Sequence, residues 1–322
     1  MVAIAVLDDY QNVALRMADW SGLQKSHRVV VFNQRLNDVE AAARALAEFD
    51  VVCVMRERMP VQRALFERLP KLRLLVTTGK RNASIDMAAA ADHKVVVCGA
   101  AGGYGGGSGL STAELAVGLM LAMARHLREE FHAMRPGGGW QTTVGFDLDG
   151  RTLGIVGLGN LGSKVAKVCA AIGMKVIAWS ENLTPERAKA QGAERVDKDE
   201  LFRRSDVISI HTVLSPRTQG LVGARELSLM KPTAILINTS RGPIVDEAAM
   251  LAALREKRIA GYGADNYDVE PAPPDHPLRS EPRALLTPHL GYVTEDTYRG
   301  FYGSTVAAIE GWLAGKPVGV IT

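Results

Sequence analysis

The sequence predicts an α/β protein made of two doubly wound, parallel-sheet domains. Short apolar runs alternate with helix-periodic segments along the whole chain, which is the pattern of consecutive βαβ units. A glycine-rich strand–turn–helix stretch lies near the middle, at residues 151–180. The length of 322 residues suits about two domains.

The N-terminal third of the chain predicts the first sheet. Ligands of such sheets bind beyond the carboxyl ends of the strands, so polar residues that follow apolar runs are candidates for a substrate-facing rim. Those residues are Asp8, Arg56, Thr78, Gly79, Lys80 and Arg81. Strands are expected at residues 3–7, 29–32, 51–55, 72–77 and 95–98, and helices at residues 13–20, 38–49, 60–69 and 85–91.

A glycine-rich connection at residues 100–109 follows the first sheet. An inter-domain linker is the favoured interpretation, and a loop that covers a ligand is the alternative. The next helix, expected at residues 115–127, is apolar nearly all round, which predicts burial between domains or subunits. Later strands are expected at residues 153–156, 176–179, 207–211, 235–238, 261–265 and 285–287, and helices at residues 165–172, 186–190, 201–204, 247–256 and 298–313.

The stretch at residues 151–180 has the order of elements that a dinucleotide site requires. Gly157, Gly159 and Gly162 stand in G-x-G-x-x-G spacing between an apolar strand and a helix. The first glycine permits the tight turn, the second lets a pyrophosphate approach the backbone, and the third lets the helix pack on the strand. Free N–H groups at the helix start would then face the phosphates. The stretch therefore predicts a dinucleotide cofactor.

The composition excludes several other classes of protein. The chain has 38 Lys plus Arg and 35 Asp plus Glu, and a net charge of +3 is too small to favour nucleic acid or a membrane surface. Cys53, Cys98 and Cys169 lie in apolar runs without metal-ligand spacing, so we expect core residues of a reducing compartment and no metal site. Neither a signal peptide nor a bilayer span is expected, and the location predicted is the cytoplasm.

Three chemically unusual residues follow strands of the second half. Arg241 lies in INTSRGP, Glu270 in DNYDVEP and His289 in LLTPHLG. Each has an ordinary structural explanation on its own: a paired arginine, a solvated glutamate and a loop histidine. Because parallel strand ends converge on one edge of a sheet, the three are predicted to meet beside the nicotinamide.

This combination resembles the D-isomer-specific 2-hydroxyacid dehydrogenases over nearly the whole chain. The matching motifs are GLGNLG at residues 157–162, NTSRG at 238–242, DNYDVEP at 265–271 and TPH at 287–289. The resemblance implies that Arg241, Glu270 and His289 are the catalytic residues. It places Asp265 near the nicotinamide carboxamide, and the amides of Asn160 and Leu161 at the diphosphate.

The resemblance also implies the domain organisation. A Rossmann cofactor domain, residues 106–290, is expected as an insertion in a flavodoxin-like substrate domain, residues 1–105 plus 291–322. The segment from Thr78 to Lys80 matches the family's substrate-carboxylate loop, and Arg56 is expected beside it. The remaining residues expected at the cofactor are Ser180, Glu181, Thr212, Thr218, Thr239, Ser240 and Gly291.

The residue types suit the reduction of a small 2-keto acid. An imidazolium at His289 can supply a proton, and a carboxylate at Glu270 would stabilise it and fix its tautomer. The guanidinium of Arg241 suits a carboxylate and the adjacent carbonyl oxygen. Glyoxylate, hydroxypyruvate and phosphohydroxypyruvate are the candidate substrates by resemblance, and a homodimer is expected. The alternative is a dinucleotide-sensing binding protein without turnover, like the corepressors related to this family.

Two departures from the family pattern bear on the cofactor. Ser180 stands where NAD-dependent members usually carry an Asp that binds the adenosine ribose, and Glu181 follows it. Serine removes the repulsion of a 2′-phosphate, whereas Glu181 could restore it, so either NAD or NADP is expected. After the strand at residues 207–211, Val213 replaces the usual proline, although Thr218 matches.

Overall fold

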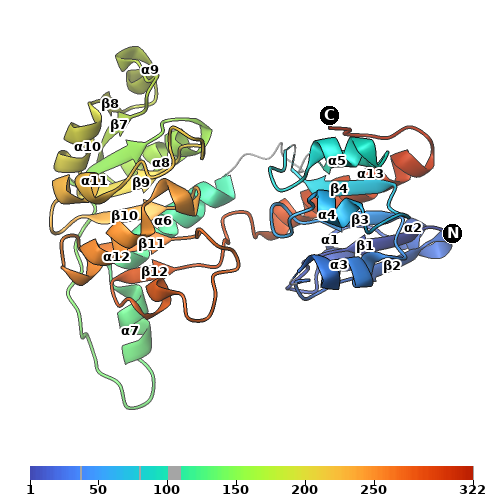
Figure 1. Cartoon of the computed structure of the whole chain (residues 1–322). Helices are drawn as coiled ribbons and strands as arrows, with labels where there is room; N and C mark the ends of the chain where they lie inside the picture. The colour runs from blue at the N-terminus through green and yellow to red at the C-terminus, as the bar shows by residue number, and fades with distance from the viewer. Residues whose placement is uncertain (37, 80, 101–109, 322) are drawn as a thin grey trace. The chain divides into compact units, whose positions relative to one another are not determined.

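The chain folds into two compact units. The computed structural model describes residues 1–36, 38–79, 81–100 and 110–321. One unit comprises Met1–Ser108 and Val293–Thr322, and the other is Gly109–Tyr292 (Figure 1). These bounds lie within a few residues of the predicted boundaries at 105/106 and 290/291. Lys80 and the glycine-rich loop at residues 101–109 lie outside the described residues, and the expectations about them stay predictions.

The first unit contains a parallel five-stranded sheet in the order β2-β1-β3-β4-β5, which is the flavodoxin-like order. Its largest apolar cluster combines the inward side chains of β1, β3 and β4, such as Ala5, Val52 and Leu75, with helix residues such as Phe66. The strands are β1 Ala3–Val6, β2 Arg28–Val31, β3 Val51–Val54, β4 Leu74–Thr78 and β5 Val96–Ala100. The helices are α1 Ala14–Met17, α2 Ser21–Ser26, α3 Val39–Leu46, α4 Arg63–Phe66, α5 Met87–Asp92 and α13 Glu295–Leu313.

The single helix predicted at residues 13–20 is wrong, because α1 ends at Met17 and a second helix, α2, begins only at Ser21. The carboxylate of Asp9 accepts hydrogen bonds from the N–H groups of Val13 and Ala14, which starts α1. Ala18 then adopts an extended conformation and ends it. The buried indole of Trp20 donates to the carbonyl of Ala14, so the aromatic ring is held against α1 while α2 begins anew.

The second unit contains a parallel seven-stranded sheet in the order β12-β11-β10-β9-β6-β7-β8, which is the Rossmann order with one strand added. The predicted fold class, two doubly wound parallel sheets, is therefore confirmed. The strands are β6 Thr152–Val156, β7 Lys175–Trp179, β8 Glu194–Arg195, β9 Val207–Ile210, β10 Ile235–Asn238, β11 Gly261–Ala264 and β12 Ala284–Leu286. The helices are α6 Leu110–Ala124, α7 Leu127–Ala133, α8 Asn160–Ala171, α9 Pro185–Ala190, α10 Lys198–Arg204, α11 Ala224–Leu229 and α12 Glu247–Arg255, with 3₁₀ turns η1 Gly242–Ile244 and η2 Pro277–Ser280.

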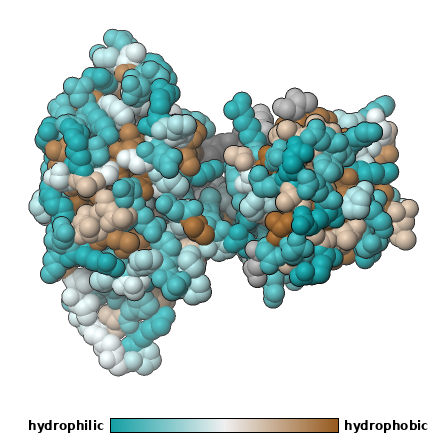
Figure 2. Space-filling model, viewed as in Figure 1, coloured by the Kyte–Doolittle hydropathy of each residue, from teal (hydrophilic) through white to brown (hydrophobic). Residues whose placement is uncertain are grey.

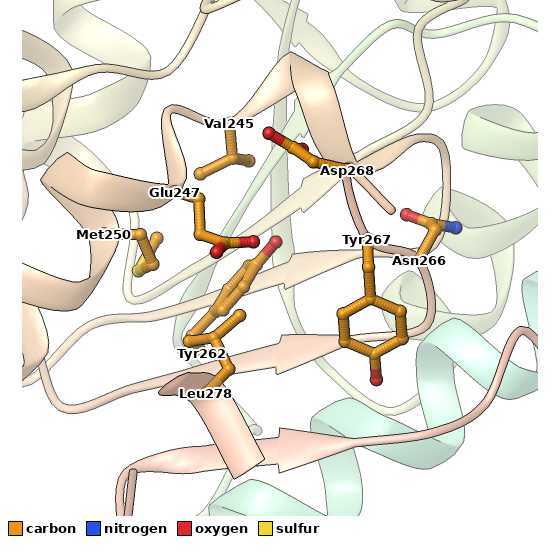
Figure 3. A pocket seen from close by; sticks show the side chains of 9 residues that line it. Val245, Glu247, Met250, Tyr262, Asn266, Tyr267, Asp268 and Leu278 are labelled. Atoms are coloured by element: carbon orange, nitrogen blue, oxygen red, sulfur yellow. The ribbon is translucent and has the colours of Figure 1, made fainter. Parts of the chain in front are cut away.

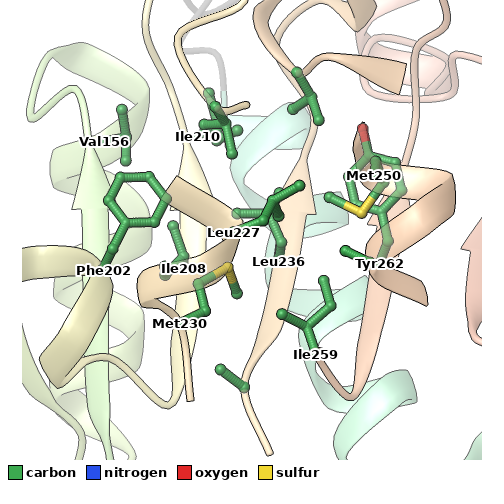
Figure 4. Close-up of a cluster of buried hydrophobic side chains, with 14 of the residues drawn as sticks. Val156, Phe202, Ile208, Ile210, Leu227, Met230, Leu236, Met250, Ile259 and Tyr262 are labelled. Carbon is green, nitrogen blue, oxygen red and sulfur yellow. The ribbon is translucent and has the colours of Figure 1, made fainter. Parts of the chain in front are cut away.

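Apolar cores cover both faces of this second sheet, as the near-continuous apolar strands require. On one face, Ile208 and Leu236 pack with Phe202 and Met250 from the helices (Figure 4). On the other face, residues of alternate strand positions pack against α6 and α8. The helix α6, which was expected between domains or subunits, packs on α8, β10 and β11 of its own unit. The sheet that it covers accounts for part of its apolar character.

The helix α7 and the chain that follows it project from the second unit (Figure 1). None of the α7 residues is buried. The chain between α7 and β6 is tied back to α7, because Thr142 and Thr143 donate hydrogen bonds to the carboxylate of Glu130. Hydrophilic side chains predominate on the face of both units that Figure 2 shows, interrupted by smaller hydrophobic patches. No helix among the described residues is long and apolar enough to cross a membrane.

Candidate active site

The glycine-rich turn after β6 has the geometry expected of a phosphate cradle. Gly157 has φ +99°, and a Cβ there would lie 2.9 Å from the backbone of His211 and Thr212. A Cβ on Gly162 would lie 2.2 Å from the carbonyl oxygen of Gly157, so α8 packs directly on the turn. Gly159 differs, because a Cβ there would meet no protein atom within 4 Å. The first and third glycines are therefore required by the packing of the turn, whereas the space beside the second glycine is open to a ligand.

The neighbouring strand ends carry buried polar atoms that suit a dinucleotide. The hydroxyl of Thr239 and Nδ1 of His211 are buried without a hydrogen-bond partner among the described residues. Burial lowers the pKa of His211 to about 4, and its Nε2 lies 2.8 Å from the hydroxyl of Ser209. Because buried polar groups ordinarily find partners, these two atoms indicate that a polar ligand belongs beside the turn. The residues present therefore fit a dinucleotide.

Two other predicted cofactor residues already use their hydroxyl groups within the protein. Ser240 donates to the carbonyl of Ile210 at 2.8 Å, and this bond joins the ends of β9 and β10. Thr218 donates to the carbonyl of Val213 and accepts from the N–H of Ser215. Their side chains therefore shape the loops around the cradle, which the sequence pattern did not indicate.

The end of β7 carries the residues that bear on NAD against NADP. Ser180, directly after the strand, is half-buried, and Glu181 is exposed. Arg187 on α9 folds back over this turn, and its Nη1 donates to the carbonyl of Asn182 at 3.3 Å. A carboxylate and a guanidinium thus belong to the same short turn region. The local charge is mixed and favours neither cofactor on its own.

The three candidate catalytic residues follow adjacent parallel strands. Arg241 comes after β10, Glu270 after β11 and His289 after β12, and these strands are hydrogen-bonded neighbours in that order. Arg241 is held from both sides: its Nη1 donates to the carbonyl of Ser240, and its own carbonyl accepts from the amide of Asn238. The prediction that the three lie along one sheet edge thus agrees with the strand order.

His289 and Glu270 form a direct pair. Nδ1 of His289 lies 2.5 Å from Oε2 of Glu270, and the side chains are 24% and 33% exposed. His289 has φ +52°, a left-handed conformation that is rare for a residue with a side chain. Its ring also meets the ring of Tyr292 edge-on, with centroids 5.3 Å apart. A partly exposed imidazole whose second nitrogen is held by a carboxylate can exchange a proton with a bound ligand.

Asp265 holds the loop that carries His289. Its carboxylate accepts from the hydroxyl of Thr287 at 2.6 Å, from the N–H of Leu290 at 2.7 Å and from the N–H of Gly291 at 2.8 Å. Burial raises the pKa of Asp265, while these three bonds oppose the rise. The family resemblance implied that Asp265 lies near the nicotinamide. Its bonds to the His289 loop could not be predicted from a sequence motif, because they depend on how the loop folds back in three dimensions.

In the first unit, three of the predicted substrate residues lie together. The N–H of Arg56 donates to the hydroxyl of Thr78 at 2.8 Å, and its guanidinium lies against Gly79. A Cβ on Gly79 would lie 2.1 Å from Nη1 of Arg56, and Gly79 has φ +96°. The glycine is therefore required for both the turn and the close approach. Among the described residues, no group of His, Cys, Asp or Glu could hold a metal ion.

Comparisons with curated proteins identify the relatives of this chain. It is 36% identical over 302 residues to a D-3-phosphoglycerate dehydrogenase of Methanocaldococcus jannaschii, a match that covers 93% of this chain and 55% of the relative. It is 38% identical over 248 residues to a glyoxylate reductase of Thermococcus litoralis, covering 74% of this chain and 73% of the relative. The chain spans about half the length of several of the curated relatives that it matches.

A solved structure and a family model agree with these matches. The phosphoglycerate oxidoreductase of Vibrio cholerae superposes with a TM-score of 0.91 at 32% identity, covering 98% of this chain and all of that one. Residues 117–291 match the family model described as D-isomer specific 2-hydroxyacid dehydrogenase, NAD binding domain. That match covers more than half of the chain and includes the glycine cradle and the His289–Glu270 pair. The chain therefore belongs to the D-isomer-specific 2-hydroxyacid dehydrogenase family.

Proposed function

We propose that this protein is an NAD(P)-dependent oxidoreductase that interconverts a small 2-keto acid and the corresponding D-2-hydroxy acid. The observation that carries the proposal is the 2.5 Å His289–Glu270 pair, located in the same unit as the glycine cradle. A nicotinamide cofactor, when bound, supplies the hydride for the carbonyl carbon. What the protein must add is a proton for the carbonyl oxygen and a fixed orientation for the substrate.

In this proposal His289 is the general acid for reduction and the general base for oxidation. Glu270 faces Nδ1, so Nε2 is the nitrogen that meets the substrate oxygen. The carboxylate stabilises the imidazolium and keeps the ring in one orientation, as a carboxylate does for a catalytic histidine. Arg241 binds the substrate carboxylate and polarises the adjacent carbonyl, because its planar fork matches two oxygens at once.

The substrate carboxylate and side chain are proposed to meet the rim of the first unit. Arg56 brings a cation to the turn that contains Thr78 and Gly79, and the backbone N–H groups of that turn suit a carboxylate. Lys80, which lies outside the described residues, is also proposed as a substrate contact. Glyoxylate, hydroxypyruvate and phosphohydroxypyruvate are the proposed substrate class, in agreement with relatives named glyoxylate reductase, hydroxypyruvate reductase and D-3-phosphoglycerate dehydrogenase.

The cofactor is proposed to lie across the cradle formed by Gly157, Gly159 and Gly162. The N–H groups of Asn160 and Leu161 at the start of α8 would face its diphosphate. Ser180 and Glu181 would meet the adenosine ribose. Further contacts are proposed from Thr212, Thr218, Thr239, Ser240, Asp265 and Gly291, and the buried unpartnered hydroxyl of Thr239 supports this assignment most directly.

A cytoplasmic homodimer is proposed as the working form. The projecting segment that begins with α7 exposes large apolar side chains, with Phe131 66%, Trp140 75% and Val144 91% exposed. Such side chains on an extension from the domain are typical of a surface that is covered by a second chain. Sedimentation analysis of the wild type and of Phe131→Ser/Trp140→Ser tests the dimer, and a wild-type monomer would refute it.

The activity is tested by a turnover assay of the purified chain. A panel of glyoxylate, hydroxypyruvate, phosphohydroxypyruvate, pyruvate and a bulkier 2-keto acid is offered with NADH and with NADPH. The proposal predicts oxidation of the cofactor with at least one small 2-keto acid, and a D-configured product wherever the product is chiral. Tight cofactor binding without turnover on the whole panel would instead favour a dinucleotide-sensing role.

A further inference from the structure

Tyr267 contacts both loops that carry the proposed acid–base pair. Its backbone N–H donates to Oε1 of Glu270 at 3.0 Å, the carboxylate oxygen that does not face His289. Its phenol donates to the carbonyl oxygen of Thr287 at 2.9 Å. One residue therefore binds the glutamate through its backbone and the loop of the histidine through its side chain.

The carbonyl of Thr287 is a critical point of the His289 loop. The same oxygen accepts from the N–H of His289 at 3.0 Å, so the phenol and the histidine backbone converge on one acceptor. His289 has φ +52°, a left-handed conformation that persists only when surrounding bonds enforce it. Loss of the phenol bond would therefore loosen the loop where the imidazole direction is set.

Tyr267 is itself firmly held. The residue is buried, and the ring of His276 meets its ring edge-on with centroids 5.5 Å apart. Nε2 of His276 lies 3.1 Å from Oε2 of Glu247 on α12, which anchors that imidazole. Figure 3 shows Tyr267 beside Asn266 and Asp268 on the wall of a small pocket whose opposite side includes Glu247 and Tyr262. Burial raises the pKa of Tyr267, so its hydroxyl remains a donor.

We infer that Tyr267 is a positioning residue that sets the distance and orientation between Glu270 and His289. This inference rests on the proposed function of the pair. In physical terms, the tyrosine joins the loops after β11 and β12, in addition to the Glu270–His289 bond and the bonds of Asp265. Tyr267 touches neither substrate nor cofactor in this account, and it acts through the pair.

The test is Tyr267→Phe, which removes the hydroxyl and keeps the ring and the backbone N–H. Tyr262→Phe is the matched control, because Tyr262 is a buried tyrosine of the same pocket. Its hydroxyl accepts from Nδ2 of Asn238 at 3.4 Å, and this bond does not involve the His289 loop. We expect kcat for keto-acid reduction to fall about tenfold in Tyr267→Phe, with an unchanged Kd for the cofactor, because misorientation affects the reacting step. Tyr262→Phe should retain the wild-type kcat.

A second readout separates this inference from the proposed function. The downfield imidazole N–H proton resonance of His289, assigned by its loss in His289→Ala, reports the short bond to Glu270. It should shift or broaden in Tyr267→Phe and stay in place in Tyr262→Phe. An unchanged resonance and an unchanged kcat in Tyr267→Phe, or equal losses in both variants, would overturn the positioning role. A wild type inactive on the whole keto-acid panel would refute the proposed function, and the resonance would still decide whether Tyr267 positions the pair.

Discussion

Nδ1 of His289 lies 2.5 Å from Oε2 of Glu270, and the two residues come from loops after adjacent strands, β12 and β11. The pair joins positions 19 residues apart in the sequence. Its geometry is maintained from both sides, since Asp265 accepts from the backbone of the His289 loop and Tyr267 donates to Glu270.

Glu270→Gln should lower kcat for reduction. The carboxylate of Glu270 lies 2.5 Å from Nδ1 of His289 and holds the ring in one orientation, and a neutral amide holds a proton-donating imidazole less well. The measurement is kcat with saturating cofactor, with Glu256→Gln at the exposed end of α12 as control. Equal kcat values in the two variants would show that Glu270 does not support the histidine.

Two glycine substitutions should separate folding from cofactor binding. A Cβ on Gly162 lies 2.2 Å from the carbonyl oxygen of Gly157, so Gly162→Ala should destabilise the protein by about 1–3 kcal/mol. A Cβ on Gly159 meets no protein atom within 4 Å, so Gly159→Ala should keep its stability and lose cofactor affinity. Urea unfolding and cofactor titration decide between these effects. Unchanged cofactor affinity in Gly159→Ala would place the pyrophosphate elsewhere.

His211 should make the stability of the protein depend on pH below neutrality. Burial lowers its pKa from the ordinary 6.5 to about 4, so the unfolded chain binds a proton in this range that the folded chain does not. The stabilisation that comes from keeping His211 neutral is fully present above pH 6.5. It is lost progressively as the pH falls towards 4, and the free energy of unfolding changes no further on account of His211 below that pH. The loss amounts to about 1–3 kcal/mol. Between pH 7 and pH 4.5, His211→Gln should lose less unfolding free energy than the wild type and than His132→Gln, and equal losses would contradict the assignment.

Both NADH and NADPH should be accepted. Ser180 can donate to either ribose, Glu181 disfavours a 2′-phosphate, and Arg187 is anchored on the same turn through the carbonyl of Asn182. The ratio of kcat/KM for the two cofactors should stay below about a thousandfold, or roughly 4 kcal/mol. Ser180→Asp should shift the ratio towards NADH. A wild-type ratio beyond that limit in either direction would mean that another group reads the ribose.

Much of the fold was predictable, because buried parallel strands leave long apolar runs. The strand at residues 235–238 was predicted with the observed bounds. The glycine spacing indicated a helix after β6, although α8 begins at Asn160 and the predicted helix began at residue 165. The strand β8 was missed, because it consists of the exposed pair Glu194 and Arg195 at the sheet edge. The helices α7 and α11 were missed as well. The first buries no residue, and the second is a segment of only 6 residues, Ala224–Leu229, too short for a clear helical period.

The sequence also placed the candidate catalytic residues at three strand ends, because a parallel sheet aligns them without further information. It could not reveal how the loops are held. The left-handed backbone of His289, the three donors to Asp265 and the phenol bond of Tyr267 all depend on turns between residues that are distant in sequence. The hydrogen bond from Ser240 to Ile210 was hidden for the same reason, whereas Thr218 bonds within its own turn, to Val213 and Ser215.

The most direct test of the account is the reduction of the best 2-keto acid by wild-type protein and by His289→Ala, measured with saturating cofactor. If His289 is the general acid, the variant should lose about 10²–10⁴-fold in kcat. It should also bind cofactor nearly as the wild type does, because the glycine cradle is untouched. Near-normal turnover in a folded, cofactor-binding His289→Ala would contradict the proposed chemistry at its centre.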